Sequence, residues 1–379
     1  MKDFLKNVKW KHYINYIAVA AFALIFGIIG LAGGLKGSTE YMLEKFAIAI
    51  ILAVSLNVVV GFLGELSLGH AGFMCVGAYI GGKVASLLDK GADNIGVLLL
   101  AVMIGGSVAA VFGFIIGLPA LRLRGDYLAI VTLAFGEIVR TIFMNTSSES
   151  FGGTLGLRTP RYDSSYLFIF GFILVLICLA VTQNMMRSKH GRAITAIRDN
   201  EIAARATGVN VTKYKLIAFT VSAFFAGVAG VLYSHSNYTV QSSVFDYNYS
   251  IEILVMVVLG GMGSINGSII AATLITFLNL QLSTVLTGDL AVLKNLIYAV
   301  ILVLIVIYNN APALKHFRER YNLRALLDKI IKRKKDPSDQ KDDEGAWDRV
   351  PTKIEMNELL STDIIVTESV QDPDKGGKS

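Results

Sequence analysis

The sequence is poor in cysteine and in charge, and each scarcity excludes a class of protein. Its two cysteines, Cys75 and Cys178, both lie in apolar stretches. This placement predicts buried free thiols, and it excludes a disulfide framework or a metal site with cysteine spacing. Charged residues make up 17% of the 379 residues, whereas a typical soluble domain has about 25%. The composition therefore argues against an ordinary soluble enzyme.

The few charges are also unevenly distributed. Residues 311–379 hold 14 Lys and Arg and 14 Asp and Glu, so 28 of the 64 charges lie in this tail. The sparse charge of the first 310 residues excludes a nucleic-acid-binding protein with charge throughout its fold. Residues 1–310 are instead predicted to form an all-α polytopic domain in a lipid bilayer, followed by a soluble tail.

About ten segments are long and apolar enough to cross a bilayer, which takes about 20 helical residues. They are residues 14–33, 41–63, 66–87, 95–117, 126–144, 166–184, 214–233, 251–267, 268–287 and 292–309. The least certain boundaries are those of 66–87, which contains Gly69 and His70, and those of the pair 251–267 and 268–287, which glycines interrupt.

Lysine and arginine are concentrated in alternate connections between these segments. They are frequent in residues 1–13, 118–125 and 185–213, whereas 234–250 has none. Because basic loops stay in the cytoplasm, both termini of this multi-pass membrane protein are predicted to be cytoplasmic.

The tail divides into two parts of opposite charge. Residues 311–335 hold nine basic residues with apolar side chains at helical spacing, which predicts a basic amphipathic segment on the inner leaflet. Residues 336–379 hold 12 acidic against five basic residues, and this composition predicts a disordered cytoplasmic tail.

The connection 188–210 is the longest on the predicted cytoplasmic side. Its spacing predicts one short helix over residues 192–198 and a second that begins at Glu201, capped by Asp199 or Asn200, and ends before Gly208. An alanine-rich helix between two membrane spans suits a groove on a partner protein, although a solvated amphipathic connector has the same pattern.

Several motifs resemble the LivM-type permeases of branched-chain amino acid ABC importers. They are GRA at 191–193, AIRDNEIAA at 196–204, GVN at 208–210, AFFAGVAG at 223–230, LSLGHAGF at 66–73, LRGDYLAIVTL at 123–133, GTLGL at 153–157 and VLGGMGS at 258–264. The resemblance covers about residues 15–310. It is less specific for substrate, since related permeases carry urea and short amides.

The resemblance implies a division of labour among subunits. The permease would form the pathway beside a second homologous permease, cytosolic ATPase subunits would power it, and an extracytoplasmic solute-binding protein would deliver the amino acid. The 188–210 loop would couple the permease to the ATPase, with Glu201, Ala204 and Gly208 at its centre. The expected coupling residues are Arg192, Arg198, Glu201, Ala203, Ala204 and Gly208.

The chain is then expected to bind no cofactor and to have no enzymatic activity. The segment from Gly77 to Lys83 has the spacing of a phosphate-binding loop, but Val84 replaces the Ser or Thr that would reach Mg²⁺. ATP would therefore be bound by the partner subunits. Five scattered histidines form no catalytic cluster, which argues against a membrane enzyme.

Polar residues and glycines within the spans are candidates for the substrate pathway. His70 lies among small residues that permit a broken helix, whose free N–H and C=O groups suit a zwitterion, although a histidine hydrogen-bonded between packed helices has the same pattern. Glu137 is the best-placed carboxylate, although its spacing to Arg140 also predicts a structural ion pair. Gly261 and Gly263 could form a hinge or simply allow close helix packing. A secondary transporter, the alternative class, would need more buried carboxylates than Glu137.

Overall fold

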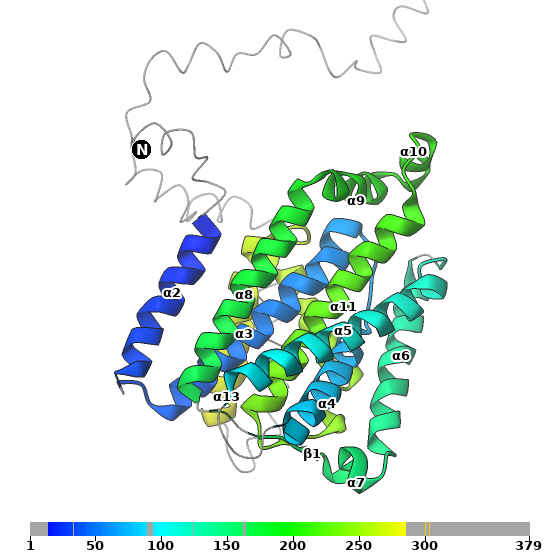
Figure 1. Cartoon of the computed structure of the whole chain (residues 1–379). Helices are drawn as coiled ribbons and strands as arrows, with labels where there is room; N and C mark the ends of the chain where they lie inside the picture. The colour runs from blue at the N-terminus through cyan, green and yellow to red at the C-terminus, as the bar shows by residue number, and fades with distance from the viewer. Residues whose placement is uncertain are drawn as a thin grey trace, which may run out of the picture. The chain divides into compact units, whose positions relative to one another are not determined.

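The computed structural model describes residues 14–32, 34–88, 94–123, 125–160, 162, 164–285, 300 and 303. The predicted tail segments 311–335 and 336–379 lie outside these residues, as does almost all of the predicted span 292–309. The described part is almost entirely helical (Figure 1). Its α-helices are α2 (Ile14–Leu31), α3 (Gly37–Asn57), α4 (His70–Leu88), α5 (Ile95–Ala120), α6 (Asp126–Met144), α7 (Ser148–Phe151), α8 (Ser164–Arg187), α9 (Lys189–Asp199), α10 (Glu201–Ala206), α11 (Val211–Ser236), α12 (Tyr247–Gly260) and α13 (Ile265–Val285).

Seven helices in the described residues are long and apolar enough to cross a membrane. They span Gly37–Leu63, His70–Leu88, Ile95–Ala120, Asp126–Met144, Tyr166–Arg187, Val211–Ser236 and Ile265–Val285. Two shorter apolar helices, Ala18–Gly30 and Tyr247–Gly260, fall within or across the predicted spans 14–33 and 251–267. The all-α polytopic membrane fold is thus confirmed, whereas the total of about ten spans stays a prediction.

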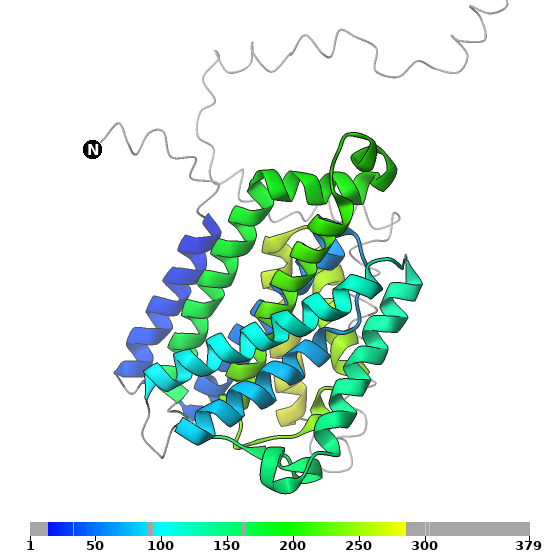
Figure 2. The same cartoon turned by 45° about the vertical axis from the view of Figure 1, so that its right-hand side comes forward.

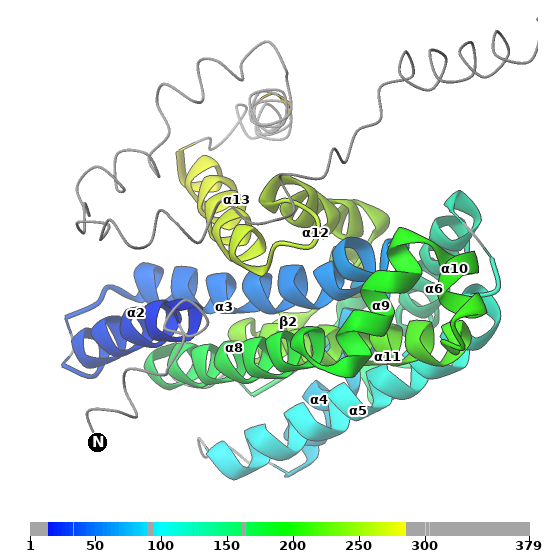
Figure 3. The same ribbon diagram turned by 90° about the horizontal axis from the view of Figure 1, so that it is seen from above.

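Helix α3 lies at the centre of the bundle. Seen from above, it lies between α8 and α11 on one side and α12 and α13 on the other (Figure 3). Every residue from Phe46 to Asn57 is buried. A helix that is apolar around its whole circumference must be covered on all sides by protein, which explains why the most apolar run in the sequence forms the core.

Helices α4, α5 and α11 cross one another at close range (Figure 2). A Cβ atom added at Gly105 of α5 would lie 2.5 Å from Val231 Cγ2 of α11, and one added at Gly230 of α11 would overlap the carbonyl oxygen of Met74 in α4. Small residues let helices approach where lipid offers no hydrophobic driving force. These glycines therefore allow α4, α5 and α11 to pack closely.

One end of the bundle carries α9 and α10, and the opposite end carries α7 and a small sheet (Figure 1). The sheet pairs β1 (Leu157–Arg158) with β2 (Thr239–Val240) in antiparallel register, Leu157 opposite Val240. The 3₁₀ turns η3 (Gly153–Leu155) and η4 (Ser242–Val244) flank the two strands. The Tyr79 hydroxyl, in the middle of α4, donates to the carbonyl oxygen of Val240 at 3.1 Å, which ties α4 to this sheet.

Two predicted span boundaries are wrong. Helix α4 begins at His70, because the chain from Gly64, which has φ +80°, to Gly69 is not helical. A Cβ at Gly69 would lie only 2.7 Å from the carbonyl oxygen of Thr132, so this connection presses against α6. The boundary between α12 and α13 falls at residues 261–264 and not at 267/268, because Gly261 and Gly263 adopt positive φ values of +89° and +81°.

Candidate coupling element and membrane pathway

The connection between α8 and α11 forms the two short helices that its sequence predicts, α9 and α10. The Asn200 side chain accepts hydrogen bonds from the N–H groups of Ile202 and Ala203, each at 3.0 Å, and so caps α10. Gly208 follows the helix with φ +84°, a left-handed conformation that favours glycine. We call residues 189–208, for which a coupling role is predicted, the coupling element.

Helix α9 packs on the bundle through Gly191, Ile194 and Ile197, which are all buried. Arg192 is exposed. The Arg198 guanidinium donates to the carbonyl oxygen of Gly61 at 3.2 Å, and it pairs with Asp199 at 2.9 Å. The predicted coupling residue Arg198 is therefore bound to the end of α3 within its own chain.

Helix α10 has an inward and an outward side. Ala204 is buried against its own chain with 4% of its surface exposed. Ala203 is exposed, and Ile202 is 75% exposed. The exposed face of α10 therefore centres on Ile202, which sequence analysis missed although it is a large aliphatic residue at the start of a charged helix.

An ion cluster around a buried lysine joins the coupling element to the membrane helices. Lys215, on the first turns of α11, is 3% exposed. Its ammonium pairs with a carboxylate oxygen of Glu65 and, at 3.2 Å, with one of Glu201. The other oxygen of Glu201 accepts from Arg205 at 2.9 Å. We call Glu65, Glu201 and Lys215 the charge triad.

The end of α3 changes to a π-helix, η2 (Val58–Leu63), where it meets the turn between α12 and α13. The Asn57 side chain accepts from the N–H of Gly263 at 2.9 Å and donates to the Ser268 hydroxyl at 3.0 Å. A Cβ at Gly61 would overlap both the Asn57 amide oxygen and the Gly263 nitrogen. π-helical segments are frequent at functional sites, and this one holds three chain segments in contact.

The non-helical connection 64–69 leads from this junction into the bundle. At its end, the His70 ring contacts the Ser55 hydroxyl at 2.9 Å, and both residues are buried. The N–H of Leu68 donates to the Thr132 hydroxyl at 3.0 Å, and that of Ala71 donates to the Ser250 hydroxyl at 3.1 Å. Side chains from α6 and α12 therefore satisfy the backbone where the helix is interrupted, as non-helical chain among membrane helices requires.

Comparison with known proteins agrees with this architecture. Residues 38–307 match the family described as the permease component of the branched-chain amino acid transport system.

The chain belongs to this family.

Two similar permeases are both named LivM, of a high-affinity branched-chain amino acid transport system. The Salmonella typhimurium LT2 protein is 37% identical over 71% of this chain and 68% of its own length. The Escherichia coli K12 protein is 40% identical over 60% of each chain. The ribose import permease RbsC of Escherichia coli K12 is 26% identical over 71% of this chain and 84% of its own. No solved structure is significantly similar to the chain.

The permease brings some of the predicted site residues together and separates others. Gly263 and Arg198 meet at the π-helix, where a Cβ on Gly263 would lie 3.5 Å from the guanidinium. Glu137 lies on α6, away from this junction. It pairs with Arg140 at 2.8 Å and accepts a hydrogen bond from the N–H of Tyr247 at 3.1 Å. The ion pair expected from their spacing is confirmed, and Glu137 also fixes the start of α12.

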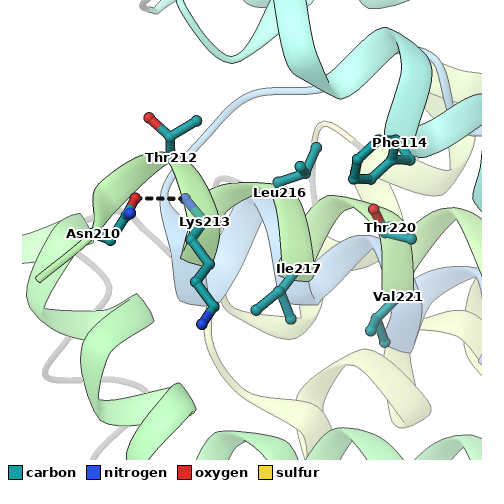
Figure 4. A pocket seen from close by; sticks show the side chains of 8 residues that line it. All are labelled: Phe114, Asn210, Thr212, Lys213, Leu216, Ile217, Thr220 and Val221. Atoms are coloured by element: carbon teal, nitrogen blue, oxygen red, sulfur yellow. Dashed lines mark hydrogen bonds between the residues drawn. The ribbon is translucent and has the colours of Figure 1, made fainter.

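A groove of about 620 Å³ lies beside the coupling element, between α5 and the start of α11 (Figure 4). Phe114, Leu216, Ile217 and Val221 form its apolar part, and Lys213 stands at its polar end. None of the predicted pathway residues lines this groove. The groove is therefore separate from the residues that were predicted to line the substrate pathway.

Polar residues at the helix junctions were missed by sequence analysis. Asn57 and Thr132 each interrupt an apolar run, and Ser250 stands at the start of one. Each forms a hydrogen bond that connects segments far apart in the sequence. A polar residue in an apolar span is itself a signal. Lys215 carries the same signal, since it is a charge within the first turns of an apolar helix.

Proposed function

We propose that this permease forms, beside a second homologous permease, the pathway by which branched-chain amino acids enter a bacterial cell. Separate cytosolic ATPases bind the coupling element and hydrolyse ATP, and an extracytoplasmic binding protein delivers the substrate. The observation that carries the proposal is the two-helix coupling element with Ile202 exposed at one end of a membrane bundle. Membership of the permease family and the names of the two LivM relatives support the substrate class.

The orientation follows from charge. The end that carries α9 and α10 is rich in Lys and Arg, whereas residues 234–250 at the opposite end have none. Because basic segments stay inside, the coupling element faces the cytoplasm, where ATP is available, and both termini are cytoplasmic in the inner membrane.

Ile202→Glu tests the docking of the ATPase. Ile202 is exposed, so the substitution leaves folding and insertion intact but places a charge in an apolar contact. We expect co-purification of the ATPases and uptake of radiolabelled leucine to fall at least tenfold. Ala204 is less suitable for this test, because a bulky residue there would disrupt the permease itself.

Leu155→Glu is the matched control, since Leu155 is 76% exposed at the opposite end of the bundle. It should leave ATPase association unchanged. Full association and uptake with Ile202→Glu would contradict the proposed docking surface. Uptake of urea or a short amide in place of leucine by the wild-type importer would contradict the substrate class.

A further inference from the structure

The charge triad joins three segments of the permease, one of which is far from the other two in the sequence. Glu201 is the first residue of α10, Lys215 belongs to α11, and Glu65 lies in the connection that follows the π-helix. Lys215 is separated from Glu65 by 150 residues and from Glu201 by 14. The triad therefore gives the coupling element a direct ionic contact with the chain that enters the bundle.

The burial of Lys215 makes this contact unusual. A buried cation loses the free energy of its hydration, and its ionic partners must compensate for this loss. Apolar residues of similar volume often stabilise a fold as well as a buried ion pair does. The Lys215 side chain is 3% exposed, that of Glu65 13% and that of Glu201 22%. The triad thus fixes the position of Glu201 relative to Glu65, although desolvation of Lys215 costs free energy. Such a contact suits a site that must hold two segments together while they move.

Both carboxylates of the triad are attached to segments with further anchors. The N–H of Glu65 donates to the carbonyl oxygen of Val59 at 3.1 Å, so Glu65 is held at the end of the π-helix. Arg198 reaches the same π-helix through the carbonyl oxygen of Gly61. The coupling element thus contacts η2 and the following connection at two points, one a hydrogen bond from a guanidinium to a carbonyl oxygen and the other an ion pair.

The other end of the connection 64–69 lies deep in the bundle. There the backbone is bound to Thr132 of α6, and His70 is bound to Ser55 of α3. The connection is short and non-helical, so it has no internal helical hydrogen bonds to break when it shifts. A displacement of Glu65 is therefore passed along a few residues to the contacts around His70.

We propose that Lys215 is the positioning residue that couples ATP hydrolysis to transport. It holds Glu201 of the docking helix to Glu65, so that movement of α10 driven by the ATPase displaces the connection 64–69 and the contacts of His70 and Thr132. This inference rests on the proposed function. It adds which residues carry motion from the docking surface into the membrane.

We call this path from Glu201 through Lys215 and Glu65 to residues 64–69 the relay. Lys215→Met tests it in the complete importer, reconstituted in vesicles with its ATPases, second permease and binding protein. Methionine keeps an unbranched apolar stem and removes the charge. We expect the complex to assemble and hydrolyse ATP, while the amount of leucine transported per ATP hydrolysed falls at least tenfold. The Lys215→Arg importer should keep this ratio close to the wild-type value, because the guanidinium can contact both carboxylates.

Lys213→Met is the matched control, since Lys213 is exposed on the same helix and its side chain lies outside the triad. It should leave the ratio unchanged. If Lys215→Met does not assemble, Glu65→Gln replaces it, because the amide keeps the shape of the carboxylate and should lower the same ratio.

Two outcomes would overturn the relay: an unchanged ratio in the assembled Lys215→Met or Glu65→Gln complex, or a failure of Lys215→Arg to keep the ratio close to the wild-type value. A wild-type chain that neither binds the ATPases nor transports leucine would instead overturn the proposed function.

Discussion

At the scale of single residues, Gly61 and Asn57 show how tightly the junction of α3 with the α12–α13 turn is built. Asn57 provides both an acceptor for the Gly263 N–H and a donor to Ser268, and Gly61 leaves the room in which this contact forms. A buried amide that uses donor and acceptor together sets the position of the turn, because an unsatisfied group there would be costly.

Replacing Gly61 with alanine should destabilise the permease. The added Cβ would overlap the Asn57 side chain and the Gly263 backbone, and overpacking of this kind costs about 1–3 kcal/mol. Thermal unfolding of the purified permease in detergent measures the loss. Gly37→Ala is the control, since a Cβ at Gly37 meets nothing within 4 Å. Equal unfolding temperatures for the two variants would contradict the close contact described here.

At the scale of elements, the coupling element depends on its caps. A helix of six residues such as α10 has little stability of its own. Its first turn fixes the backbone of several residues and gains only one hydrogen bond, so the conformational entropy lost exceeds the energy gained. The Asn200 side chain satisfies two of its free N–H groups, and Lys215 holds its first residue through Glu201. The docking surface is thus ordered by contacts outside the helix.

Asn200→Ala should loosen α10 without unfolding the permease. Loss of an N-cap costs about 0.5–2 kcal/mol, which is a large part of the local stability of one short helix. We expect faster amide hydrogen exchange at residues 201–206 and an affinity for the ATPases that is lower by about fivefold, as 1 kcal/mol implies.

Asn210→Ala provides the comparison. Asn210 caps α11 through the N–H of Lys213 at 3.1 Å, but α11 has 26 residues and extensive packing. The same chemical loss should therefore have little effect on exchange beyond its first turn. Identical behaviour of the two variants would show that the caps are unimportant for docking.

The sequence predicted elements better than the contacts between them. The pair α9 and α10, with its Asn and Gly signals, follows from local rules of capping that act within a few residues. Hydropathy could not show that residues 64–69 are non-helical, because Leu66 and Leu68 are apolar whichever conformation they adopt. The hydrogen bond between Leu68 and Thr132 that stabilises this connection spans 64 residues. Similarly, the family resemblance implied that Ala204 lies at the centre of the coupling loop, but only the packed structure shows that it faces inward.

At the scale of the whole molecule, the two ends of the bundle differ in chemistry and are predicted to face different compartments. Leu155 and Ile202 are the natural reporters, since they are 76% and 75% exposed at opposite ends. The native thiols Cys75 and Cys178 are buried at 0% and 1% exposure, so they contribute little background to labelling.

Leu155→Cys should react with a membrane-impermeant maleimide in intact spheroplasts, and Ile202→Cys should react only after lysis. Labelling is read as a mass shift on a gel. Prior treatment with a permeant thiol reagent should abolish the signal of both variants, which confirms that each new cysteine is accessible. Labelling of Ile202→Cys in intact spheroplasts would place the coupling element outside and overturn the orientation.

The interrupted start of α4 also constrains how the protein is made. Ala71 finds the acceptor for its N–H on Ser250, a residue synthesised 179 positions later. A ribosome that has released α4 into the bilayer therefore leaves its first turn incomplete until α12 emerges. Because an unsatisfied backbone group in lipid costs several kcal/mol, the nascent chain must keep this turn near water, or in the insertion machinery, during the interval. We therefore expect the first turn of α4 to reach its final contacts only after α12 has been synthesised.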